Sequence, residues 1–318
     1  MKRLISLIVS LLILAVIYWK IDFAGLIGVF QNCDRGWMAV SLSMVVPLTM
    51  LTAWRLQQLM PPSGRLGFGE ANRLILAASV LNMVLPSKMG DIAKAYFMKQ
   101  RGHLDGSLSL SLVVFEKACD LLSLLLWCAF GLMLYPQKDW LFWVMTGAVA
   151  FGLVAGVMLL GSRKFAQIFF RFARGVSPKK ISSKLEKLQL SWREMQQFFW
   201  QDSRQLLKIT LTSIFIWFGH LLQIWFFIFA LKAWTPFLAN LALSPLAILA
   251  GLLPLTFAGV GTRDAALIAF YSPYFNAPTA AALGLLCTSR YLLPAIGGLP
   301  FLGQYMAALQ YMRGVQKK

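Results

Sequence analysis

Residues 241–264 read LALSPLAILAGLLPLTFAGVGTRD, and this stretch decides the fold class. An apolar run from Leu241 to Leu253 meets Pro254, and a turn containing Gly259 and Gly261 separates it from a second short apolar run. A helix of that length covers about 20 Å, whereas the hydrocarbon core of a bilayer is about 30 Å thick. Proline and glycine break a helix at the join. The stretch therefore predicts a re-entrant hairpin of two half-length helices.

A second stretch of the same kind lies earlier in the chain. Residues 74–97 read LILAASVLNMVLPSKMGDIAKAYF, in which an apolar run ends at Pro86 and a turn with Gly90 precedes another short helix. Each stretch combines Leu-Pro, a glycine turn, a basic residue and an aspartate. Irregular backbone at membrane depth is tolerated only inside protein or beside a wet cavity. We therefore expect both turns to line a cavity.

Outside these hairpins, six stretches are long and apolar enough to cross a bilayer. They run over 4–19, 37–54, 107–135, 140–161, 206–231 and 279–309. The composition agrees, because 58% of the residues are hydrophobic and only 13% are charged, with a mean hydropathy of +0.67. A soluble chain carries about twice that share of charge. The sequence predicts an all-α polytopic membrane protein, with residues 1–318 as a single integral membrane domain, and excludes a soluble enzyme.

The order of these elements predicts an inverted repeat. The first half-repeat covers about 37–135 and the second about 206–309, each as a span, a hairpin and a span in opposite orientations. Transporters built in this way place their substrate where the two broken segments meet. An alternative interpretation makes both broken stretches full spans with proline kinks.

Basic residues orient the chain in the membrane. The segment 162–208 holds eleven Lys and Arg against three acidic residues, and basic loops resist translocation, so this amphipathic segment is predicted to be cytoplasmic. Six crossings, with 4–19 as a retained anchor, then put both termini and the run Arg55, Arg65 and Arg73 on that side of the cytoplasmic (inner) membrane. The total of 30 Lys and Arg against 12 Asp and Glu indicates cytoplasmic loops and anionic lipid, and no nucleic acid.

Two acidic residues lie deep in the predicted span 107–135. Glu116 and Asp120 lie roughly 14 Å and roughly 20 Å from its start and share one helix face, where like charges repel unless a cation or proton lies between them. The candidate partners are Lys88, Lys94, Arg263 and Arg290. Charged groups inside a membrane are costly unless paired and by default mark a site, although a purely structural ion-pair network would give the same pattern.

Basic residues outnumber acidic residues by about one in this set, which favours a cavity for a phosphate or another anionic head group. The basic members are Lys88, Lys94, Lys117, Arg263 and Arg290, and the acidic members are Asp91, Glu116, Asp120 and Asp264. Four scattered cysteines and two histidines offer no ligand spacing for a metal, so we expect neither a metal nor a cofactor.

These motifs, taken in order, resemble the lysylphosphatidylglycerol synthase transmembrane region, a flippase-like integral membrane family. The resemblance is carried by Asn82 through Lys94, by Glu116, Lys117 and Asp120, by Pro254 through Asp264, and by Arg290 and Tyr291. It implies that Asn82 and the charged residues bind substrate, and that the backbone turns are formed by Pro86, Gly90, Pro254, Gly259 and Gly261. Family members typically carry Arg at 88, 94 and 117 and Glu at 264. Lysine lacks the bidentate fork, so the geometry of head-group capture is expected to differ here.

The resemblance implies transbilayer movement of an anionic or lipid-linked head group, such as an aminoacylated phospholipid or a polyprenyl-phosphate sugar. The full-length synthases add a soluble aminoacyltransferase domain, which we do not expect after Lys318. We therefore expect a transporter without enzyme activity that works beside a separate lipid-modifying or glycosyltransferase enzyme. Two alternatives stay open: a membrane-embedded phospholipid or polyprenyl-phosphate transferase, and a small-solute or ion exchanger.

Overall fold

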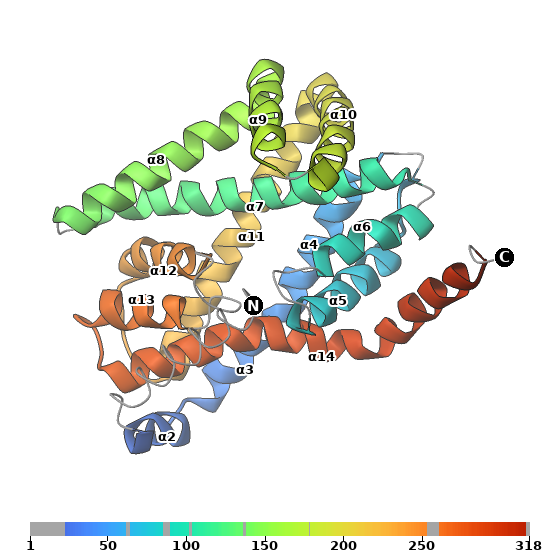
Figure 1. Cartoon of the computed structure of the whole chain (residues 1–318). Coiled ribbons are helices and arrows are strands. Elements are labelled where there is room, and N and C mark those ends of the chain that lie inside the picture. The colour runs from blue at the N-terminus through green and yellow to red at the C-terminus, as the bar shows by residue number, and fades with distance from the viewer. Residues whose placement is uncertain are drawn as a thin grey trace.

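The structure, a computed structural model, describes residues 23–61, 64–84, 90–101, 104–135, 138–177, 179–252 and 261–315. In these ranges every regular element is a helix (Figure 1). The helical segments long and apolar enough to cross a membrane are 35–59, 108–134, 142–161, 203–230 and 277–303. They coincide with five of the predicted spans and confirm an all-α polytopic membrane protein. The predicted span 4–19 lies outside the described residues, as do Pro86, Lys88, Pro254 and Gly259 of the predicted site.

The first described span consists of two short helices, and the long central spans are single helices. In chain order the elements are α2 (Phe23–Gln31), α3 (Arg35–Ser43), α4 (Val45–Leu59), α5 (Phe68–Val84), α6 (Gly90–Arg101), α7 (Gly106–Leu134), α8 (Trp140–Gly161), α9 (Arg163–Val176), α10 (Lys179–Gln201), α11 (Ser203–Ala230), α12 (Phe237–Leu252), α13 (Thr262–Tyr271) and α14 (Ala277–Val315).

Short polar side chains fix where several of these helices begin. Asp34, Asp139 and Ser162 accept hydrogen bonds from the backbone N–H groups at the third helical position, over 3.0, 2.8 and 3.2 Å respectively. Asp202 caps α11 in the same way. Such caps satisfy N–H groups that have no partner inside the helix, which matters most at a membrane boundary. The sequence therefore specifies the helix starts locally.

The ends of the long helices gather on two opposite sides of the bundle. On one side, called here the α10 side, Gln196 donates to the carbonyl oxygens of Leu159 and Leu160 at the end of α8, and Phe199 stacks on Phe115 in the first half of α7. On the other side, called the Tyr135 side, Tyr135 follows the end of α7 and its ring stacks on that of Phe142 at the start of α8, 6.4 Å away. The helices α7 and α8 therefore run in opposite directions.

Two helical hairpins pack inside this frame. α5 begins near the α10 side, where Gln57 of α4 donates to the Leu66 carbonyl over 2.7 Å, and α5 then packs against α6. α12 packs against α13, which ends near the Tyr135 side, where the rings of Phe270 and Tyr135 are 6.4 Å apart. The re-entrant course of these hairpins and the boundaries of the two half-repeats stay predictions.

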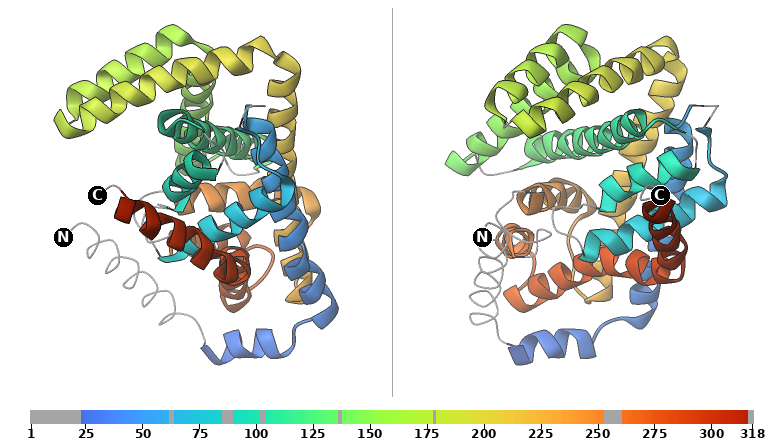
Figure 2. Two further views of the ribbon diagram at one scale, coloured as in Figure 1. Left: turned by 90° about the vertical axis from the view of Figure 1, so that its right-hand side faces the viewer. Right: turned by 45° about the vertical axis from the view of Figure 1, so that its right-hand side comes forward.

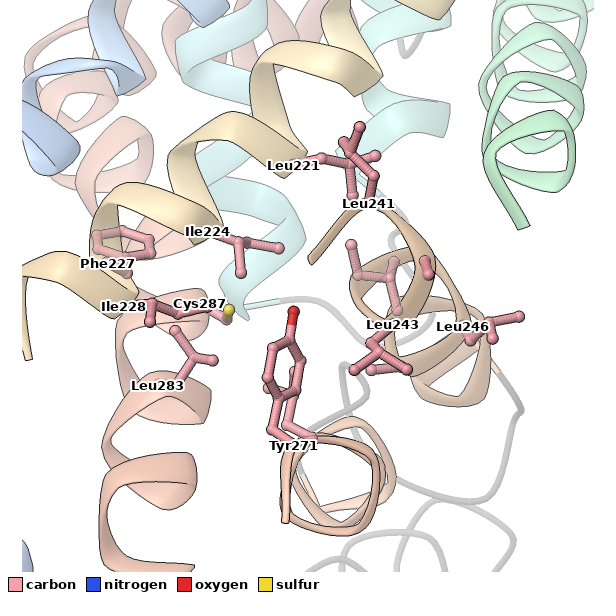
Figure 3. Packing of buried hydrophobic residues seen from close by; sticks show 14 of the residues in the cluster. Leu221, Ile224, Phe227, Ile228, Leu241, Leu243, Leu246, Tyr271, Leu283 and Cys287 are labelled. Atoms are coloured by element: carbon pink, nitrogen blue, oxygen red, sulfur yellow. The ribbon is translucent and has the colours of Figure 1, made fainter. Parts of the chain in front are cut away.

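A buried polar contact fastens the second hairpin to the rest of the bundle. The ring of Tyr271 stands between α12 and α14, with its hydroxyl directed toward α11 (Figure 3). The hydroxyl donates to Asn240 Oδ1 over 2.9 Å and lies 2.7 Å from Ser244 Oγ. Asn240 in turn donates to the Leu221 carbonyl of α11 over 3.0 Å. Buried polar groups are stable when they are hydrogen-bonded, so these contacts fix α13 in position.

A tight contact at Gly90 closes the first hairpin, and its loss is testable. A Cβ at Gly90 would collide with the backbone of Ala78 and Asn82 in α5. We expect Gly90→Ala to lower the free energy of unfolding by about 1–3 kcal/mol, because α5 and α6 would be forced apart. Thermal unfolding in detergent, followed by tryptophan fluorescence, measures this change. The matched control is Gly147→Ala in α8, where a Cβ meets nothing within 4 Å and no loss is expected. Equal melting temperatures for the two variants would contradict the tight α5–α6 contact.

Candidate substrate cavity

A cavity of about 340 Å³ lies inside the helix bundle. Residues from α4, α5, α6, α7, α11, α13 and α14 line it. Eight of the ten predicted substrate-binding residues are among them: Asn82, Asp91, Lys94, Glu116, Lys117, Asp120, Arg263 and Arg290. Of the other two, Lys88 lies outside the described residues and Asp264 does not line the cavity. Apolar side chains such as Leu48, Ile75 and Ile216 complete the wall. The cavity thus joins residues that are far apart in the sequence.

Six charged residues on one wall form a continuous chain of ion pairs that curves around α4, α6 and α7, called here the charged ring. Arg55 lies 3.1 Å from Glu116 and also pairs with Asp120, and Lys94 pairs with Glu116. Lys117 lies 3.4 Å from Asp91 and 3.7 Å from Asp120. Asp91 and Lys94, the two ends of this chain of pairs, are three positions apart on α6. Positive and negative charges alternate around it, so the ring has no net charge.

The interior position of the ring explains why every member is paired. Arg55, Lys94 and Glu116 are almost completely buried, and Arg55 also donates to Ser213 over 3.0 Å. A buried charge is costly unless an opposite charge and hydrogen bonds compensate it. The repulsion expected between Glu116 and Asp120 is therefore relieved by Arg55, which lies between them, by Lys94 at Glu116 and by Lys117 at Asp120.

Arg55 is a charged cavity residue that the sequence alone assigned wrongly. Its place in the run Arg55, Arg65 and Arg73 predicts a loop charge, but α4 continues to Leu59 and buries Arg55 in the bundle. Arg65 and Arg73 are exposed. The sequence did contain a signal that Arg55 belongs to the span: Leu56 and Leu59 continue its apolar helical pattern after Arg55.

On the opposite wall, Arg263 and Asp264 form a pair that joins α13 to α14. Arg263 Nη2 donates to Asp264 Oδ1 over 2.7 Å, to the Gly284 carbonyl over 2.9 Å and to Thr288 Oγ1 over 2.8 Å. Asp264 Oδ2 accepts from the Gly261 N–H over 3.0 Å. Gly261 has φ 104°, a conformation that other residues rarely adopt. Asp264 therefore positions Arg263, which does line the cavity.

Arg290 differs from the other basic residues of the cavity. It is 8% exposed, and no carboxylate in the described part of the chain forms an ion pair with it. Its Nε has no hydrogen-bond partner there. The ring is neutral and Arg263 is matched by Asp264, so among the described cavity residues the surplus positive charge resides at Arg290. The surplus of about one positive charge predicted from the sequence counted Lys88, which lies outside the described residues. When Arg55 is counted instead, the described cavity residues and Asp264 again carry one more positive than negative charge.

Buried polar atoms without a partner concentrate around this cavity. Among the described residues they include Asn82 Oδ1, His220 Nδ1, Gln223 Oε1 and the Nε atoms of Arg55 and Arg290, all from residues that line it. Buried polar atoms normally have partners, so these positions fit a polar ligand group or water. Among the described side chains, no three His, Cys, Asp or Glu come together as metal ligands would.

Comparison with known proteins gives two findings. A family model described as the lysylphosphatidylglycerol synthase TM region matches residues 3–298, a range that contains every cavity residue. The UPF0104 membrane protein MJ1595 of Methanocaldococcus jannaschii is 22% identical over 336 residues, which cover 100% of this chain and 97% of that protein. Both matches extend over nearly the whole chain, including both helical hairpins.

Proposed function

Because the chain belongs to the family of the lysylphosphatidylglycerol synthase transmembrane region, we propose that it moves a membrane lipid across the bilayer with the anionic head group held beside Arg290. Family membership and the apolar helices establish an integral membrane protein with a role related to membrane lipids. The observation that carries the finer proposal is the buried guanidinium of Arg290 in the cavity wall, which has no ion-pair partner among the described residues.

The chemistry of an arginine explains the choice of an anionic head group. A guanidinium presents its N–H donors in a planar fork that matches two oxygens of a phosphate. Such charge-assisted hydrogen bonds are strong in a low-dielectric interior. The charged ring and the Arg263–Asp264 pair are internally neutral, so a bound phosphate would compensate the charge at Arg290 without breaking either. The acyl chains would stay in the bilayer.

The arrangement of the helices supports access from both membrane surfaces. α5 begins near the α10 side and α13 ends near the Tyr135 side, and both hairpins contribute to the cavity wall. In transporters with inverted repeats, broken helices from two halves enclose the substrate, and the halves move against each other. We extend the proposal to a re-entrant course for both hairpins. Because the segment 162–208 is basic, we also propose that the α10 side and both termini face the cytoplasm and that the protein lies in the cytoplasmic membrane.

Reconstitution of the purified chain tests this function. Liposomes of phosphatidylcholine and phosphatidylglycerol carry a trace of fluorescent phosphatidylglycerol, and dithionite bleaches only the label in the outer leaflet. We expect the protein to expose inner-leaflet label to bleaching faster than protein-free liposomes do, and native mass spectrometry to find an anionic lipid bound. Bleaching at the protein-free rate together with no bound lipid would contradict the proposal.

The same experiment separates transport from catalysis. We propose that the lipid crosses without covalent change, and that a separate lipid-modifying or glycosyltransferase enzyme makes it. Mass spectrometry of the recovered lipid should therefore show the mass that was supplied. A new lipid product formed by the purified protein would instead support the membrane-embedded transferase. Movement of a water-soluble anion without lipid movement would support the exchanger.

A further inference from the structure

Helix α9 is a second candidate interaction surface, separate from the cavity. It begins directly after the membrane-spanning α8 ends, with Ser162 as its N-cap, and lies with α10 at one end of the molecule (Figures 1 and 2). Its 14 residues would cover about 21 Å, which is too short to cross the hydrocarbon core. It therefore belongs to the boundary of the membrane rather than to the spans.

Three different faces run along α9. The first packs on the protein, because Ala166 and Phe170 are buried and the ring of Phe170 lies 6.1 Å from that of Trp192. The second is apolar and exposed, and includes Phe172 at 72% and Val176 at 74% exposure together with Ile168 and Phe169. The third carries the exposed basic residues Arg163, Lys164 and Arg171. A helix of this kind is typical of the interface between acyl chains and head groups.

Contacts from α10 fix the depth of this surface. The indole Nε1 of Trp192 donates to the Leu159 carbonyl over 3.3 Å, and that of Trp200 donates to the Leu160 carbonyl over 3.1 Å. These carbonyl oxygens belong to the last turn of α8, where the chain leaves the membrane. Tryptophan is enriched at that level of membrane proteins. The hairpin of α9 and α10 is thereby held at the membrane surface.

We propose that α9 lies in the head-group layer and binds acidic phospholipids, with its apolar face among the acyl chains and its basic residues beside the phosphates. The positive charge of the basic residues on α9 is the reason for proposing acidic phospholipids as the ligand. A purely apolar face would fit any lipid, whereas three exposed basic residues beside it favour a negatively charged surface. This binding is independent of the proposed transport and holds whatever the cavity carries.

Quenching by brominated lipids tests the proposal on the full chain. A Phe169→Cys variant in a Cys33→Ser background is labelled with bimane, since the other three cysteines are buried. The protein is placed in liposomes that contain brominated phosphatidylglycerol or brominated phosphatidylcholine in otherwise equal mixtures. We expect quenching by both lipids, with the phosphatidylglycerol preferred by roughly five-fold for each basic residue that engages it.

Two matched variants make the result specific. Adding Arg163→Gln, Lys164→Gln and Arg171→Gln together should remove the preference for phosphatidylglycerol and leave the quenching itself, because the apolar face is unchanged. A Phe151→Cys label on α8, at a side chain that is 76% exposed, should be quenched equally by both lipids. Absence of quenching at 169 would overturn the proposal and indicate water or a protein partner. Equal quenching by the two lipids at 169 would also overturn it.

Discussion

Replacement of Arg290 by glutamine is expected to lower lipid transport roughly ten- to hundredfold, the loss that corresponds to one charge-assisted hydrogen-bonding group. The protein should stay at least as stable as the parent. Arg290 has no ion-pair partner among the described residues, and an unpaired buried charge costs stability. The dithionite assay measures the first effect, and thermal unfolding in detergent measures the second.

Two further variants separate charge from general damage. Arg290→Lys keeps the charge but loses the planar fork, so an intermediate rate is expected. Arg35→Gln removes an exposed arginine at the start of α3, outside the cavity, and should transport at the parent rate. A normal rate for Arg290→Gln would show that the surplus charge does not hold the head group, whereas an unstable protein would assign Arg290 a structural role.

Loss of Glu116 is expected to have the largest effect on stability. Glu116→Leu leaves Lys94 without its partner and removes one of the two carboxylates that compensate Arg55. Breaking a buried ion pair from one side typically costs about 3–5 kcal/mol. The double variant with Lys94→Met and Glu116→Leu should recover much of this loss. It removes one charge of each sign and leaves Arg55 paired with Asp120.

Thermal unfolding of the parent, both single variants and the double variant forms a double-mutant cycle that isolates the pair. Glu194→Leu on the exposed face of α10 is the control, because exposed substitutions usually change the free energy of unfolding by less than about 0.5 kcal/mol. If the double variant is less stable than Glu116→Leu alone, the two residues do not compensate each other and the charged ring is not the stabilising unit described above.

These expectations assign different roles to the two walls of the cavity. The ring joins α4, α6 and α7 by alternating charges, so its members are expected to act mainly on stability. Arg290 carries the charge that the described protein leaves unmatched, so it is expected to act mainly on binding. Arg263 lies between these cases: it lines the cavity, and it also ties α13 to Gly284 and Thr288 of α14.

Several features of the fold were predictable because their causes are local. Five described spans agree with the hydropathy of the sequence, since an apolar helix must match the thickness of the bilayer. The deep positions of Glu116 and Asp120 followed from counting residues along one helix. The need of Glu116 for a basic partner, and Lys94 as a candidate, followed from the cost of charge inside a membrane.

The sequence by itself determined the membrane class, the described spans and, apart from Arg55, the described charged residues that line the cavity. Only the tertiary structure decided which charges meet. Arg55 and Asp120 are 65 positions apart, and their contact depends on how α4 packs against α7. Likewise, Asp264 lies outside the cavity wall and pairs with Arg263, which lines it, and Arg290 has no ion-pair partner among the described residues. Hydropathy and helix breaks act over one or two turns, whereas an ion pair requires two side chains within about 4 Å, a condition set by packing.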